Sequence, residues 1–259
     1  MSLGDHVEPL ARLGYAARGV IYLIVGGLAL LTAVGQGGQT TGSKGALASL
    51  MSQPFGHVLL GIVAAGLVGY SIWRFVQAVW DLDRHGTDPK GLVIRSGLMV
   101  SAFTHAGLAF FCASILFGIG GGSGGGSKEM IRWVLGLPLG QWMVGAAGLA
   151  VIGAGVANAA KGVTAKYKKR LDMDDQTMRW AGPLCTFGLA ARGVAFFIVG
   201  GLIIVAAVTF DPDQARGLAG ALDTLHRQPY GPYLLGTLAL GLFAFGVYSA
   251  IEAFYRRIG

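Results

Sequence analysis

The chain has 259 residues, of which 53% are hydrophobic and only 13% charged, whereas about a quarter of an ordinary soluble domain is charged. This composition excludes a water-soluble globular protein. The formal net charge is +7, but the charged residues lie mainly in loops between apolar runs, which argues against a nucleic-acid partner. Forty-four glycines are too many for a soluble helical core but are typical of membrane helices, whose backbones approach closely.

Apolar runs long enough to cross a bilayer core of about 30 Å, for which a helix needs about 20 residues, recur along the chain. They fall at residues 10–34, 57–80, 97–119, 139–160, 184–208 and 232–254. Barrel strands need only about 10 alternating residues, so runs of this length must satisfy their backbone hydrogen bonds as helices. We therefore predict an all-α integral membrane protein with six transmembrane helices in a single domain, 1–259.

Basic residues are unevenly divided between the two sides that these crossings define. Fifteen Lys and Arg lie on the side of the N-terminus and five on the other side. Because cytoplasmic loops carry the excess, both termini are expected in the cytoplasm and the glycine tract at 120–126 outside. The run from Lys166 to Arg170 is then either a topology signal or a contact for anionic lipid or protein. The predicted location is an inner (cytoplasmic) membrane.

Three copies of one two-helix unit make up the chain. The first and last copies share Ala-Ala-Arg-Gly-Val, at 16–20 and 190–194, and Ile-Val-Gly-Gly-Leu, at 24–28 and 198–202. The middle copy has Ala-Gly-Leu-Ala-Phe-Phe at 106–111, which places Ala106 where the other copies have arginine. Small residues seven positions apart in the odd helices, such as Gly19 and Gly26, predict a seam of close helix contact.

The even helices repeat as well, and each follows a motif with proline and glycine. The motifs are Gln-Pro-Phe-Gly at 53–56, Leu-Pro-Leu-Gly at 137–140 and Gln-Pro-Tyr-Gly at 228–231. Proline in a first helical turn loses no hydrogen bond, so these motifs predict helix starts. Since each unit has an even number of spans, we expect three parallel repeats around a pseudo-threefold axis, at residues 10–82, 95–165 and 180–257.

These motifs resemble those of the bacterial membrane domain-of-unknown-function family 1206, whose unit has Ala-Arg-Gly-Val in its first helix and Gln-Pro-Phe-Gly before its second. The resemblance covers nearly the whole chain. It implies six helices in a bacterial inner membrane and no assigned activity, so it brings no catalytic residues. The middle copy lacks the arginine and the glutamine, and a strictly threefold site is therefore not expected.

No constellation of residues specifies a reaction. The sequence has no phosphate-binding lysine loop, no histidine pair at metal spacing and no Ser-His-Asp set. We expect that the protein is not an enzyme and that it has no cofactor and no metal site. Ionisable residues within the spans remain as candidates for a ligand site, because they are costly in lipid.

Arg18 and Arg192 occupy the same position in the first and third repeats, roughly 12 Å into their helices. They are either snorkelling topology anchors or helix-end braces, or they contact a ligand or ion as members of an anion site. In such a site Glu252 offers a counter-charge and His105 a weaker third member; alone, His105 is a hydrogen-bonded packing residue. One aligned position of the even helices reads Gln77, Lys161 and Glu252. It lies near the cytoplasmic boundary, which predicts a solvated helix end.

Two classes of function fit the sequence. The first is a non-catalytic membrane protein that scaffolds a partner or binds lipid or a small ligand, favoured because no acidic cluster or broken helix suggests ion-coupled transport. The second is a small channel or transporter for an anionic or small solute along the pseudo-threefold axis. The expected partners are membrane lipids and a protein within the membrane, including a second copy of the chain as a homo-oligomer.

Overall fold

The structure is a computed structural model that describes residues 3–83, 85–119 and 125–257. Within these ranges the chain is almost entirely helical and contains no β-sheet. The helices long and apolar enough to cross a membrane are α1 (Leu3–Ala33), α3 (Gly56–Trp80), α4 (Pro89–Leu116), α6 (Gly140–Val163), α7 (Asp175–Thr209) and α9 (Gly231–Tyr255). The prediction of an all-α membrane fold with six spans is confirmed. Residues 120–124 of the glycine tract lie outside the described residues.

The first helix of each repeat begins before its apolar run. α4 starts at Pro89 and α7 at Asp175 because an aspartate caps each helix: Asp88 accepts from the N–H of Gly91 at 3.1 Å and Asp174 from that of Thr177 at 2.9 Å. Hydrogen bonds from the Thr177 hydroxyl and N–H also hold the pKa of Asp174 below its ordinary value. Apolar windows alone miss these polar first turns.

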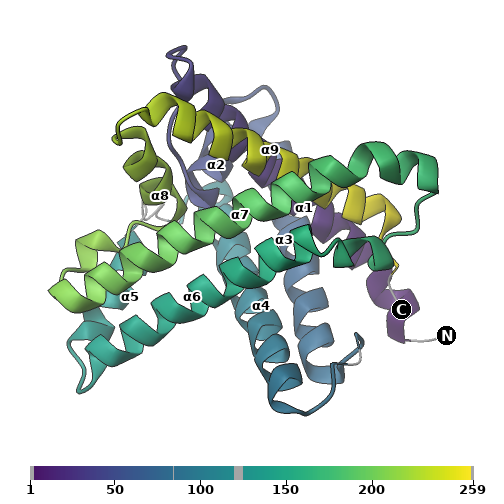
Figure 1. Cartoon of the computed structure of the whole chain (residues 1–259), viewed down its shortest axis with the longest axis horizontal. Helices are drawn as coiled ribbons and strands as arrows, with labels where there is room; N and C mark the ends of the chain where they lie inside the picture. The colour runs from purple at the N-terminus through teal and green to yellow at the C-terminus, as the bar shows by residue number, and fades with distance from the viewer. Residues whose placement is uncertain (1–2, 84, 120–124, 258–259) are drawn as a thin grey trace.

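Pairs of helices from neighbouring repeats form the framework of the bundle. The first helix of each repeat packs most extensively against the second helix of another repeat: α1 against α9, α4 against α3 and α7 against α6. Figure 1 shows these three pairs running in different directions. Among these helices α9 packs on α1, which joins the third repeat to the first. Contacts within a repeat join α1 to α3 and α7 to α9, whereas α4 and α6 of the middle repeat do not pack extensively, so the ring expected for three repeats around a pseudo-threefold axis is open at this point.

Glycines bring two of these pairs into close contact. A Cβ on Gly19 of α1 would lie 3.1 Å from the carbonyl oxygen of Gly246 on α9, and one on Gly193 of α7 would lie 2.9 Å from that of Gly155 on α6. The predicted seam is therefore confirmed in the first and third repeats. It is wrong in the middle repeat, where a Cβ on Gly107 would meet nothing within 4 Å, because Gly107 lies on an exposed face of α4.

Each even helix begins at the glycine of its motif, but the proline lies two residues before the helix rather than in its first turn. The motif closes a four-residue turn, in which the N–H of Gly56 donates to the carbonyl of Gln53 at 2.9 Å. The residue between proline and glycine has a positive φ in all three copies: Phe55 at 60°, Leu139 at 64° and Tyr230 at 61°.

Shorter helices cover the end of the bundle away from the termini. They are α2 (Ser43–Ser49), α5 (Gly125–Leu135) and α8 (Gly217–His226), with the 3-10 helices η1 (Leu50–Ser52) and η3 (Pro212–Gln214). Leu47 of α2 and Leu222 of α8 are fully buried against the spanning helices. The opposite end carries the 3-10 helix η2 (Lys166–Arg170). The outer surface is apolar, with Phe110 75% and Leu149 63% exposed, as expected for contact with lipid.

Candidate functional site

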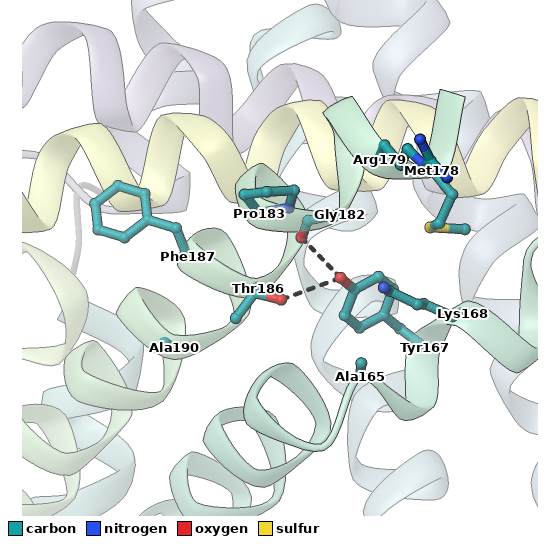
Figure 2. Close-up of a pocket in the computed structure, with 10 residues that line it drawn as sticks. All are labelled: Ala165, Tyr167, Lys168, Met178, Arg179, Gly182, Pro183, Thr186, Phe187 and Ala190. Carbon is teal, nitrogen blue, oxygen red and sulfur yellow. Dashed lines mark hydrogen bonds between the residues drawn. The ribbon is translucent and has the colours of Figure 1, made fainter. Parts of the chain in front are cut away.

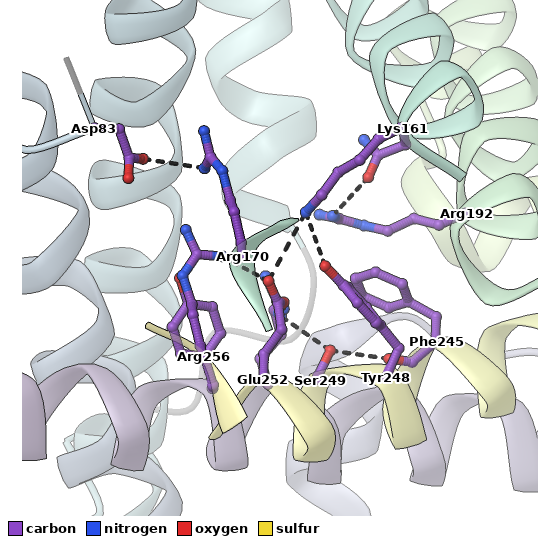
Figure 3. A network of polar contacts seen from close by, with 12 residues as sticks. Asp83, Lys161, Arg170, Arg192, Phe245, Tyr248, Ser249, Glu252 and Arg256 are labelled. Carbon is purple, nitrogen blue, oxygen red and sulfur yellow. Dashed lines mark hydrogen bonds and ion pairs between the residues drawn. The ribbon is translucent and has the colours of Figure 1, made fainter. Parts of the chain in front are cut away.

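Polar side chains gather inside the bundle towards the end where α1 begins and α9 ends (Figure 3). We call this group the cationic cluster and define it by Arg18, Arg74, Lys161, Arg192, Arg256 and Glu252. Its core is shielded from the outside, since Arg18 is only 4% and Glu252 only 2% exposed. Charged groups at this depth need partners, because an unpaired buried charge is strongly unfavourable.

Arg18 and Glu252 form the centre of the cluster. The Arg18 Nη2 pairs with the Glu252 carboxylate, so the counter-charge suggested by the sequence lies where expected. Arg18 also donates from Nη1 to the Tyr70 hydroxyl at 2.6 Å and from Nε to the Ser249 hydroxyl at 3.1 Å. Every nitrogen of this guanidinium thus has a partner. Arg18 is a buried, paired residue, and the interpretation as a snorkelling anchor is wrong for it.

Glu252 faces two further cations. The Arg256 Nη1 donates to its Oε1 at 2.6 Å, and the Lys161 Nζ lies 3.8 Å from the same oxygen. Lys161 and Glu252 belong to the aligned position of the even helices that was predicted to be a solvated helix end. That prediction is wrong, because Gln77 and Glu252 are buried and Lys161 reaches inward to Glu252. All three stand 21 residues after the glycine that begins their helix, which gives them the same depth.

Arg74 on α3 is a cluster member that the sequence reasoning missed, and so is Arg256 after the end of α9. The Arg74 Nη2 donates to the Tyr70 hydroxyl, which also accepts from Arg18, and its Nη1 donates to the Gln77 side-chain oxygen at 3.1 Å. Its position in the repeat explains its presence. Arg74 stands 18 residues after the first residue of α3, and the equivalent residues of α6 and α9 are Asn158 and Ser249.

Asn158 and Ser249 are the hydrogen-bond acceptors of Arg192 and Arg18. In the α1/α9 and α7/α6 pairs, therefore, the first helix of a repeat carries an arginine and the helix packed against it carries the acceptor. In the α4/α3 pair, α4 has Ala106 instead of an arginine, and α3 carries Arg74. The middle repeat lacks its own arginine on α4, and Arg74 of the neighbouring helix α3 takes its place. An alignment of α3, α6 and α9 shows this exchange.

Arg192 on α7 has only neutral partners. Its Nη1 donates to the Asn158 side-chain oxygen at 3.2 Å and its Nε to the Tyr22 hydroxyl at 3.3 Å. Its Cζ lies 4.6 Å from the ring centroid of Phe245, and the Cζ of Arg18 lies 5.2 Å from the same ring. No carboxylate among the described residues forms an ion pair with Arg192.

His105 lies at the edge of the cluster and does not bind its charged members. Its Nδ1 is 2.7 Å from the carbonyl oxygen of Ser101, one turn earlier on α4. Its ring packs edge-on against Tyr70 with centroids 4.5 Å apart. This is the hydrogen-bonded packing role that the sequence left open, and no direct contact makes His105 a third member of an anion site.

The charges of the cluster do not balance. Three of its five cations, Arg18, Lys161 and Arg256, face the single carboxylate of Glu252, and the other two have neutral hydrogen-bond partners. Asp83 lies at the border, where it pairs with Arg170 at 3.2 Å outside the cluster. Within the described part of the chain, the buried Nε atoms of Arg74 and Arg256 have no hydrogen-bond partner. The described residues also contain no group of three metal-ligating side chains. The cluster presents cationic hydrogen-bond donors, which suit an anion.

Fold and cluster together define a multi-pass membrane protein built from three two-helix repeats. The model of the family Domain of Unknown Function (DUF1206) matches residues 13–81, 96–165 and 187–256, and the chain belongs to this family. The chain is 35% identical over 255 residues to the uncharacterized protein YxxB of Bacillus subtilis (strain 168), an overlap of 97% of this chain and 92% of that protein. No solved structure matches the chain significantly. The resemblance seen in the sequence is confirmed, and it brings no assigned activity.

Proposed function

We propose that the protein is a non-catalytic membrane protein that binds an anionic group at the cationic cluster. The observation that carries the proposal is the excess of positive charge in the cluster, which contains five cations and one carboxylate, Glu252, that pairs with three of them. In the interior of a membrane protein such an excess is stabilised by an anion. Guanidinium groups present planar donors that match phosphate and carboxylate, which makes these the expected ligand groups.

Arg192 and Lys161 are the cations best placed to receive the anion. Arg18 is saturated by its own partners, whereas Arg192 has neutral ones and the Lys161 side chain is 32% exposed. Both reach α9 from the α6/α7 pair, Arg192 at Phe245 and Lys161 at Tyr248. This side adjoins the middle repeat, whose helices lie apart. It is therefore the side on which the surrounding membrane comes nearest to the cluster.

The positive-inside distribution supports an inner-membrane location with both termini in the cytoplasm. The cluster then lies in the cytoplasmic half of the membrane. A phosphate or carboxylate there comes either from a lipid headgroup or from a small cytoplasmic solute, and the two sources share the same binding chemistry.

Thermal unfolding of the purified chain in detergent, with and without inorganic phosphate, tests the proposal. Phosphate should stabilise the wild type, and Arg192→Gln should weaken its apparent affinity roughly tenfold or more, because a charge-assisted hydrogen bond contributes about 1.5–3 kcal/mol. Arg132→Gln, an equal change on exposed α5, is the matched control and should respond like the wild type. An identical phosphate response in all three proteins would show that the cluster binds no anion.

A channel or transporter for an anion is the second candidate, favoured by the presence of three repeats in one bundle. Against an open path stand the large side chains that fill this centre, since Tyr15, Tyr70 and Phe245 are at most 1% exposed. Phosphate flux into vesicles that contain the purified protein separates the candidates. Flux that is lost in Arg192→Gln supports transport, and binding without flux supports a binding protein.

A further inference from the structure

A groove separate from the cationic cluster runs along the outside of α7, where η2 crosses it (Figure 2). Its volume is about 640 Å³. Lys168 of η2 and Arg179 of α7 lie at one end, and Pro183, Phe187 and Ala190 follow along α7. From Arg179 to Ala190 the helix rises roughly 16 Å at 1.5 Å per residue.

Tyr167 holds the two walls of this groove together. It is 1% exposed, and its hydroxyl donates to the carbonyl oxygen of Gly182 at 2.7 Å and lies 3.0 Å from the Thr186 hydroxyl. Gly182 and Thr186 belong to α7, whereas Tyr167 belongs to η2. The groove is therefore a built feature of the fold, fixed by a buried tyrosine that joins its two walls.

The two ends of the groove differ in chemistry. Lys168 and Arg179 are exposed, and neither forms an ion pair with another described residue. Towards the middle of α7 the wall is apolar, and Phe187 is 42% exposed. α7 starts at the end of the bundle where the termini lie, so the cations sit at the level of headgroups and the apolar wall at the level of acyl chains.

We propose that this groove binds one anionic phospholipid, with its phosphate at Lys168 and Arg179 and an acyl chain along Pro183, Phe187 and Ala190. Charge complementarity selects an anionic headgroup, because no carboxylate among the described residues forms an ion pair with either cation. The length of the apolar wall selects a lipid over a free phosphate, which would leave that wall unused. This site goes beyond the proposed anion site of the cationic cluster and does not depend on it.

Native mass spectrometry of the full chain, titrated with phosphatidylglycerol or phosphatidylcholine, tests the headgroup end. Each cation near a membrane surface contributes about fivefold to anionic lipid affinity, so the double variant Lys168→Gln/Arg179→Gln should bind phosphatidylglycerol roughly 25-fold more weakly. Its affinity for phosphatidylcholine should not change. Lys169→Gln removes the neighbouring exposed charge that does not line the groove and should leave both affinities unchanged. Equal weakening by Lys169→Gln would indicate a diffuse basic surface and overturn the site.

The apolar end is tested with Ala190→Trp, which fills the groove, against Val194→Trp, a lipid-exposed position one turn further along α7. Only Ala190→Trp should displace bound phosphatidylglycerol. Glycerol phosphate without acyl chains should fail to compete, and full competition would show a free-phosphate site instead and overturn the proposal. Arg192→Gln should leave lipid binding in the groove unchanged, so failure of this site and failure of the cluster are distinguishable. Thermal unfolding of each variant verifies that it is folded.

Discussion

Replacing Glu252 by glutamine removes the only negative charge of the cationic cluster and keeps the shape of the side chain. The carboxylate pairs directly with Arg18 and Arg256 and lies 3.8 Å from the Lys161 Nζ. Removing one partner of a buried ion pair costs about 3–5 kcal/mol. Because three cations lose their counter-charge together, we expect a loss of about 5 kcal/mol in the free energy of unfolding for Glu252→Gln, at the upper end of that range.

The matched control is Glu8→Gln, which removes the partner of Arg12 on the surface. Glu8 and Arg12 form the same kind of pair, four residues apart, but their side chains are 39% and 36% exposed. Exposed pairs contribute about 0–1 kcal/mol, so this variant should unfold like the wild type. The assay is thermal or denaturant unfolding in detergent, followed by circular dichroism. Equal stability of Glu252→Gln and Glu8→Gln would refute the view that Glu252 neutralises the cluster.

Further predictions follow from the repeat geometry. Arg74→Gln should weaken phosphate stabilisation about tenfold through loss of one charged donor, as measured by the same unfolding assay. If phosphate stabilises Arg74→Gln as strongly as the wild type, Arg74 does not belong to the anion site. Gly200→Leu should lower the free energy of unfolding by about 1–3 kcal/mol, because a Cβ there would lie 2.7 Å from a carbonyl oxygen of α6. Gly107→Leu, at the first seam position of the middle repeat, should be tolerated because a Cβ there would meet nothing within 4 Å.

The sequence predicted the spans and the repeats because both depend on local patterns. Apolar length determines which segments cross the membrane, and shared motifs determine which residues are equivalent. The pairing of Arg18 with Glu252 followed from depth and opposite charge alone. Equivalence does not say which helices pack together, however. The main pairs form between repeats, and this could not be read from a motif.

Depth along a helix was also an incomplete guide to the site. Gln77 and Glu252 lie near a helix end, which favoured solvent, but α1 and neighbouring helices extend past them and bury them. α4 and α7 begin with polar turns that are capped by aspartates. These turns have no apolar pattern from which the sequence could predict them. Arg74 was missed because it was assigned to the cytoplasmic side as a topology charge, and only the contacts of Tyr70 show that it faces inward.

The pairing of α1 with α9 has a consequence for how the protein is made. α1 is synthesised well before its main partner, α9, and Arg18 and Glu252 are 234 positions apart. Until α9 has entered the membrane, α1 lacks both the helix that packs against its glycines and the carboxylate that pairs with Arg18. The α1/α9 pair therefore forms only after α9 has been made, and a nascent chain without α9 leaves the charge of Arg18 unpaired in the membrane.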